Sequence, residues 1–207
     1  MIATLLADIG VFVFAITGVL ASAPRTRNAI SLLMLAVITA LGGGTIRDMI
    51  LGVPVFWLTE FSFVVIALAG GVSAFFLFRT YRRMFTLLLY FDAIGLAIFA
   101  IVAMEKSYSV SSNAGVAIIM GLITGIGGGL VRDLLTGRPT LLLSQELYAT
   151  PVLIGCVVYS LLRPLDQNRD LAEILSIGLI LGLRAAAIRW NWGTILPTTN
   201  CPPLPNK

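Results

Sequence analysis

Seven apolar runs, each about as long as a bilayer is thick, constrain this chain more than any other feature. A helix needs about 20 apolar residues to cross a hydrocarbon core of about 30 Å. Short polar or proline-containing turns separate the runs. We therefore expect an all-α membrane protein with seven transmembrane helices, at residues 2–21, 29–51, 60–79, 85–104, 114–136, 147–163 and 170–189.

The composition excludes a soluble domain. Of the 207 residues, 58% are hydrophobic and 12% are charged, and the mean hydropathy is +0.98. Soluble domains have about a quarter of their residues charged. The net charge of +4 comes from residues at the ends of the runs, so it indicates orientation in a membrane and contact with lipids, and no nucleic acid partner. We expect one transmembrane domain over residues 1–190 and a cytoplasmic tail over residues 191–207.

The side chains that support most enzyme chemistry are scarce. The chain has no histidine, and its two cysteines, Cys156 and Cys201, lie far apart in the sequence. No cluster has metal-ligand spacing, and no nucleophile stands beside a base. We therefore expect no enzyme activity, no metal site and no cofactor, and two free thiols.

Two segments of the chain are near-copies of each other. Residues 42–54 and residues 127–139 both read Gly-Gly-Gly-x-x-Arg-Asp-x-x-x-Gly-x-Pro. The same offset in residue number that aligns residue 42 with residue 127 also aligns Gly10 with Gly95 and Phe14 with Phe99. One gapless displacement across three runs indicates an internal duplication. We expect repeat one at about residues 1–84, repeat two at about 85–169, and helix seven, at about 170–189, outside the duplication.

The number of helices in each repeat determines from which side of the membrane the next repeat begins. Three is odd, so the second repeat enters the membrane from the opposite side. The sequence therefore predicts two inverted three-helix repeats, an arrangement found in many transport proteins.

Two glycine triplets lie at corresponding places in the repeats. Each glycine costs about 1 kcal/mol of helix propensity relative to alanine. A helix break is tolerated at membrane depth only where it is buried in protein or faces water. Paired breaks indicate a permeation or binding site whose freed carbonyls favour a cation, whereas close packing of helices is the alternative explanation. The candidate pore and kink residues are Gly42, Gly43, Gly44, Gly127, Gly128 and Gly129.

Charged residues within membrane runs are candidates for a functional site. Adjacent residues on a helix point about 100° apart, so we expect Arg47 and Arg132 to find partners on other helices. We predict the pairs Arg47 with Asp8 and Arg132 with Asp92, one near each mouth of a central pathway. Helix capping is an alternative role for one copy of the motif, where Asp48 follows Thr45 by three residues. The candidate charged pore residues are Arg47, Asp48, Arg132, Asp133, Asp92 and Asp8.

Lysine and arginine are distributed unequally between the two ends of the expected helices. Ten lie on the side opposite the N-terminus and four on the N-terminal side. Cytoplasmic loops are the more basic ones. The count therefore predicts an N-terminus outside the cell and a cytoplasmic C-terminus.

The doubled motif, in a chain with seven expected helices, resembles the prokaryotic branch of the trimeric intracellular cation channel family, whose domain is also described as a glycine transporter. The resemblance covers about residues 1–190. It implies a homotrimer with one pore in each protomer, lined by helices two and five, which are kinked at their glycine triplets. It implies passage of potassium and sodium ions. Animal members have a Lys-Glu-Val motif in a basic region that holds a phosphoinositide, whereas this sequence has Arg132-Asp133-Leu134 there, so we expect neither that lipid nor a location in the reticulum. The compact chain suits the plasma membrane of a prokaryote.

Two functions are compatible with these features. One is a passive cation channel, in which carbonyls and carboxylates replace part of the hydration shell of the ion. The alternative is a secondary transporter of a small amino acid such as glycine, because inverted repeats with broken helices also occur in carriers.

Overall fold

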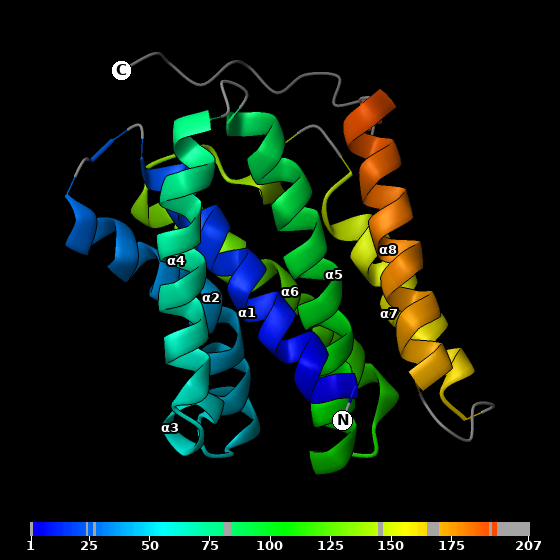
Figure 1. The fold of residues 1–207 in the computed structure, drawn as a ribbon. Coiled ribbons are helices and arrows are strands. Elements are labelled where there is room, and N and C mark those ends of the chain that lie inside the picture. The colour runs from blue at the N-terminus through cyan, green and yellow to red at the C-terminus, as the bar shows by residue number, and fades with distance from the viewer. Residues whose placement is uncertain are drawn as a thin grey trace, which may run out of the picture.

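The computed structural model describes residues 2–23, 25–26, 28–80, 84–144, 147–164, 170–190 and 192–193. These residues form helices and connecting turns (Figure 1). The longer helices coincide with the expected runs, and the largest difference is at the end of α5, which continues to Val110. The elements are α1 (Ile2–Ser22), α2 (Ala29–Leu51), α3 (Phe56–Thr59), α4 (Ser62–Thr80), α5 (Met84–Val110), α6 (Ala114–Leu135), the 3₁₀ turn η1 (Leu141–Leu143), α7 (Ala149–Leu162) and α8 (Asp170–Trp190).

The helices have the length and hydropathy of membrane spans. Five of those described are long and apolar enough to cross a bilayer: Thr4–Ser22, Ala29–Leu51, Phe85–Val110, Ala114–Leu135 and Asp170–Trp190. Ser62–Phe76 and Ala149–Leu162 are shorter apolar helices. The prediction of an all-helical membrane protein is confirmed.

Equivalent asparagines start α2 and α6. The Asn28 side chain accepts hydrogen bonds from the backbone N–H groups of Ile30 and Ser31, at 3.0 and 3.3 Å. Asn113, its counterpart in the second repeat, does the same for the second and third residues after it. These bonds satisfy N–H groups that would otherwise lack partners at the first turn. The two helices that contain the doubled motif therefore begin in the same way.

The central helices are α1, α2, α5 and α6, which pack against one another (Figure 1). Helix α4 packs on α1 and α2, while α7 and α8 lie together against α5. Glycines permit the close contacts: a methyl group on Gly70 would lie 2.5 Å from the carbonyl oxygen of Phe12, and one on Gly155 would collide with Ile180. A hydrogen bond of 2.6 Å from the Tyr159 hydroxyl to Glu105 joins α7 to α5.

Some expectations concern residues outside those described. They are the tail from residue 194 onward, with Cys201, and five of the basic residues used for orientation: Arg27, Arg82, Arg83, Arg169 and Lys207. Cys156 is a buried free thiol.

Candidate functional site

The first copy of the motif forms a charged cluster at the end of α2. Arg47 Nε donates to Asp48 Oδ1 at 2.8 Å. Lys106, near the end of α5, places its Nζ 2.8 Å from the same oxygen. Asp48 is fully buried and Arg47 almost so. One buried carboxylate therefore holds two cations.

The other oxygen of Asp48 fixes the chain that follows. Asp48 Oδ2 accepts a hydrogen bond of 2.9 Å from the backbone N–H of Phe56, the first residue of α3. Between them Gly52 has a φ of +66°, in the left-handed region, where glycine avoids the steric cost of a Cβ. The aspartate and the glycine of the motif thus have a structural function, in which they end α2 and attach α3 to it.

The second copy repeats this arrangement at the end of α6. Arg132 Nε donates to Asp133 Oδ1 at 2.9 Å, and Asp133 Oδ2 accepts from the backbone N–H of Leu141 at 3.1 Å. Gly137 has a φ of +57°. Leu141 starts η1 and is the counterpart of Phe56 under the displacement between the repeats. The whole motif is therefore one local structure that occurs twice.

The second cluster has partners that the first lacks. Arg132 Nη1 lies 2.7 Å from Asp92 Oδ1, and the hydroxyl of Tyr148 donates to Asp92 Oδ2 at 2.9 Å. Asp92 and Arg132 are completely buried, and Tyr148 is nearly so. The predicted pair of Arg132 with Asp92 is confirmed. Removal of either partner would leave an uncompensated buried charge, which is strongly destabilising.

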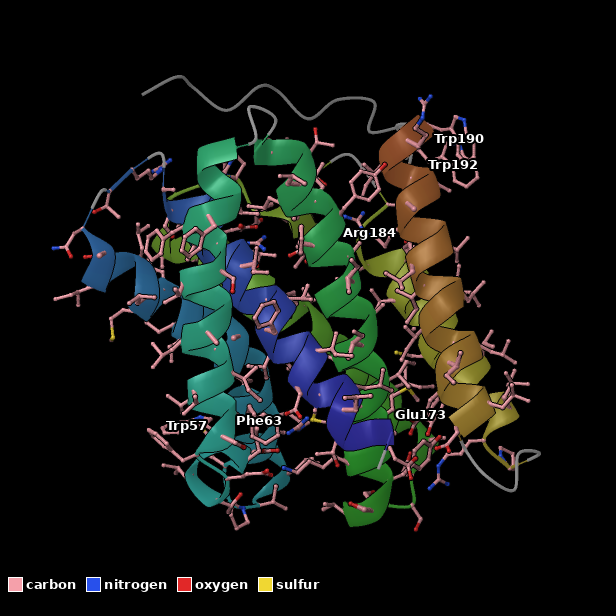
Figure 2. The ribbon with its side chains drawn as sticks, viewed as in Figure 1. Trp57, Phe63, Glu173, Arg184, Trp190 and Trp192 are labelled. Atoms are coloured by element: carbon pink, nitrogen blue, oxygen red, sulfur yellow. The ribbon has the colours of Figure 1, made fainter. Side chains whose placement is uncertain are left out.

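Arg184 reaches this cluster from α8, outside the duplicated part of the chain (Figure 2). Its Nη1 donates to the carbonyl oxygen of Leu147 at 2.8 Å, and its guanidinium lies 4.8 Å from the centre of the Tyr148 ring. Leu147 N–H in turn donates to the carbonyl oxygen of Trp192 at 3.0 Å. The end of α8 therefore positions Tyr148 on Asp92.

The predicted pair of Arg47 with Asp8 is wrong. Among the described residues, Arg47 hydrogen-bonds to Asp48, and no contact joins it to Asp8. The long arginine side chain bends back across the step of about 100° between adjacent residues, so its Nε and Nη2 both reach the short aspartate. The same bend gives the pair of Arg132 with Asp133. The inference that an arginine could not pair with the aspartate next to it was therefore incorrect.

The glycine triplets lie inside continuous helices. Helix α2 runs without a break through residues 42–44, and α6 through residues 127–129. The expected helix breaks are absent there, and a bend of the helix axis at these glycines stays a prediction. The middle glycines serve close packing instead: a methyl on Gly128 would lie 2.6 Å from the carbonyl oxygen of Thr39, and one on Gly43 would collide with that of Thr124. The two contacts are reciprocal, because Gly43 and Gly128 are counterparts in the two repeats and so are Thr39 and Thr124.

Two phenylalanines stack in the middle of the central helices. The rings of Phe14 on α1 and Phe99 on α5 have their centroids 5.3 Å apart, with an angle of 30° between their planes. Both are buried. A methyl on Gly95 would meet Phe14 at 2.5 Å, and one on Gly10 would meet Phe99 at 3.4 Å. Phe14 and Phe99, which are equivalent residues of the two repeats, thus contact each other at the centre of the molecule.

Three residues of the two clusters were not predicted from the sequence. Lys106 looked like one more charge at the end of a run. Tyr148 takes the position of Phe63 in the other repeat, a difference that alignment of the two repeats would have shown. Arg184 lies inside the last apolar run, where a charge indicates a functional role by default, so that signal was available.

Comparison with known proteins identifies the family. The sequence pattern of the family described as Glycine transporter matches residues 4–79 and again residues 89–164, so each repeat gives its own match. The inner membrane protein YadS of Escherichia coli (strain K12) is 37% identical over 190 residues, covering 88% of this chain and 90% of that protein.

Solved structures give the same result. The trimeric intracellular cation (TRIC) channel orthologue from Rhodobacter sphaeroides is 33% identical, with a TM-score of 0.88 over 92% of this chain and 99% of that one. A second TRIC cation channel is 34% identical, with a TM-score of 0.84 over 99% of this chain and 100% of that one. This chain therefore belongs to the Glycine transporter family, the family of the prokaryotic TRIC channels, and has their fold.

Proposed function

We propose that this protein is a cation channel that conducts potassium and sodium. One observation supports the proposal most strongly: along nearly its whole length the chain matches solved TRIC cation channels, at one third identity and a TM-score of up to 0.88. In one case the alignment covers 99% of this chain and 100% of the solved one.

The proposed pathway lies inside one protomer, between α1, α2, α5 and α6. It runs from the cluster of Arg47 and Asp48 to the cluster of Arg132, Asp133 and Asp92, with Asp8 near its first mouth. A carboxylate that releases its arginine and binds a passing cation would replace part of the hydration shell of that cation. The burial of the charge pairs and the stacked rings of Phe14 and Phe99 between them support a closed state. In the open state the helices α2 and α6 bend at Gly42–Gly44 and Gly127–Gly129.

The proposed architecture has seven spans, with α4 and α7 crossing the membrane in addition to the five longer helices. In this architecture the spans before α8 form two inverted repeats, and α8 lies outside them. The two separate family matches, which share one displacement at both of their ends, support the duplication. We further propose a homotrimer with three separate pores, an N-terminus outside and a cytoplasmic C-terminus in the plasma membrane of a prokaryote. The TRIC relatives are trimeric by name, and the E. coli relative is an inner membrane protein.

Ion flux in proteoliposomes tests the proposal. Purified protein is reconstituted with a potassium gradient, and a voltage-sensitive dye follows the membrane potential. We expect a potassium-driven potential that needs no glycine, a similar result with sodium, and none with chloride as the only permeant ion. Glycine accumulation without a potassium leak would instead identify a carrier, and protein-free liposomes provide the baseline.

A further inference from the structure

A small cavity lies beside the first cluster, at the end of the molecule where Phe63 lies (Figure 2). It has a volume of about 130 Å³. A buried water needs only about 10–15 Å³ of such space, so the cavity has room for a molecule of about four or five heavy atoms. The residues that matter for its chemistry are Ala7, Gly44, Arg47, Phe56, Phe63 and Lys106.

In the second repeat two polar side chains stand at the corresponding positions. Ala7 and Phe63 have Asp92 and Tyr148 as their counterparts under the displacement between the repeats. A methyl on Gly129, the counterpart of Gly44, would lie 3.0 Å from Asp92 Oδ1 and 3.0 Å from the Tyr148 hydroxyl. In the second repeat a carboxylate that binds the equivalent arginine, and a hydroxyl that binds this carboxylate, therefore lie beside the equivalent glycine. In the first repeat alanine and phenylalanine leave that space open.

The charges around the cavity favour an anion. Arg47 and Lys106 line it, and both pair with Asp48, whose second oxygen already accepts the N–H of Phe56. Two cations thus share one carboxylate, whereas Arg132 has two, Asp133 and Asp92. Asp8 and Glu60 are not among the lining residues. The Lys106 side chain is 30% exposed, which gives a ligand a way in.

We propose that this cavity binds a small carboxylate, of the size of acetate or propionate. Its carboxylate group takes the place that Asp92 fills in the second repeat and binds Arg47 and Lys106 by charge-assisted hydrogen bonds. Its remaining carbons lie against the rings of Phe56 and Phe63. The carboxylate of Asp92 in the second repeat thus shows where the carboxylate of the ligand would lie in the first repeat. Arg47 and Phe99 belong both to the lining of this cavity and to the proposed cation pathway, but the binding proposal rests on the charges of the cavity and not on conduction.

Equilibrium binding of radiolabelled acetate to the purified full-length protein in detergent tests the proposal. We expect saturable binding of one acetate per chain, displaced by propionate. An equal concentration of sodium chloride should displace it at least tenfold less well. Equal displacement by chloride would overturn the assignment to carboxylates, and so would a lack of saturable binding. The measurement involves no ion flux, so it succeeds or fails independently of the channel.

Variants place the ligand in the cavity. Ala7→Asp combined with Phe63→Tyr installs the side chains of the second repeat, and we expect it to fold and to lose acetate affinity at least tenfold. Ser112→Asp is the matched control, because it adds a carboxylate at an exposed position beyond the end of α5 that does not line the cavity, and it should leave acetate affinity unchanged. Lys106→Met should also weaken binding at least tenfold while Arg47 still pairs with Asp48. Wild-type affinity in both cavity variants, with normal thermal unfolding, would overturn the proposal.

Discussion

The rings of Phe14 and Phe99 stack on each other, 5.3 Å between centroids, at the centre of the four helices that form the proposed pathway. The two residues occupy the same position in the two repeats. Apolar constrictions stop ion flow by excluding water. This pair therefore explains how a chain with charged clusters at both ends can remain closed between them.

Removing one ring should open the pathway. We expect Phe99→Ala to raise potassium flux in proteoliposomes at least severalfold above wild type without an added stimulus, because water would enter the space left by the ring. Phe61→Ala, a change at an exposed phenylalanine, should leave flux unchanged. Equal flux in all three proteins would show that the stacked rings do not close the pathway.

The buried pair of Asp92 and Arg132 should contribute strongly to stability. Removing one partner of a buried ion pair costs about 3–5 kcal/mol, and Asp133 offsets part of this by remaining beside Arg132. We expect Asp92→Asn to destabilise the protein by about 2–4 kcal/mol, seen as a lower thermal unfolding temperature in detergent. Asp170→Asn, at an exposed site on α8, should change it little. A similar temperature for both variants would contradict this role of Asp92.

The two motif aspartates should protect specific backbone amides. Asp48→Ala removes the acceptor of the Phe56 N–H, and Asp133→Ala removes that of the Leu141 N–H. We expect faster hydrogen exchange at residues 56–59 in the first variant and at 141–143 in the second. Each variant serves as the control for the other. Unchanged exchange at both segments would show that the aspartates do not hold these short helices.

Neighbouring glycines of one triplet should differ sharply in their tolerance of a methyl group. At Gly43 the methyl would collide with the Thr124 carbonyl, whereas at Gly42 it would meet nothing within 4 Å. Overpacking of this kind costs about 1–3 kcal/mol, and alanine otherwise favours a helix by about 1 kcal/mol. We expect Gly43→Ala to lower the thermal unfolding temperature and Gly42→Ala to maintain or raise it. The reverse order would contradict the packing role of Gly43.

The sequence predicted the helices well because their signal is local. Each long apolar run had to form a helix, since a membrane leaves no other way to satisfy its backbone. The short elements α3 and η1 were not predicted, because the first residue of each donates its backbone N–H to an aspartate eight positions earlier. The three or four residues of each short element contain no sequence signal for such a bond.

The candidate site was only partly predictable. The pair of Arg132 with Asp92 followed from placing two opposite charges near the same end of the molecule. The pair of Arg47 with Asp8 failed under the same reasoning, since an arginine flexible enough to reach Asp48 needs no distant partner. The contacts of Arg184 depend on how α8 packs against α5. Because α8 lies outside the two repeats, no equivalent residue exists from which these contacts could be inferred.

The reciprocal contacts of Gly43 with Thr124 and of Gly128 with Thr39 couple the two repeats mechanically. Each glycine lies against a backbone carbonyl of the other repeat, so α2 and α6 cannot move apart or together at one contact without changing the other. A larger residue at one glycine would require a shift of the opposite helix, and that shift would reach the second glycine as well.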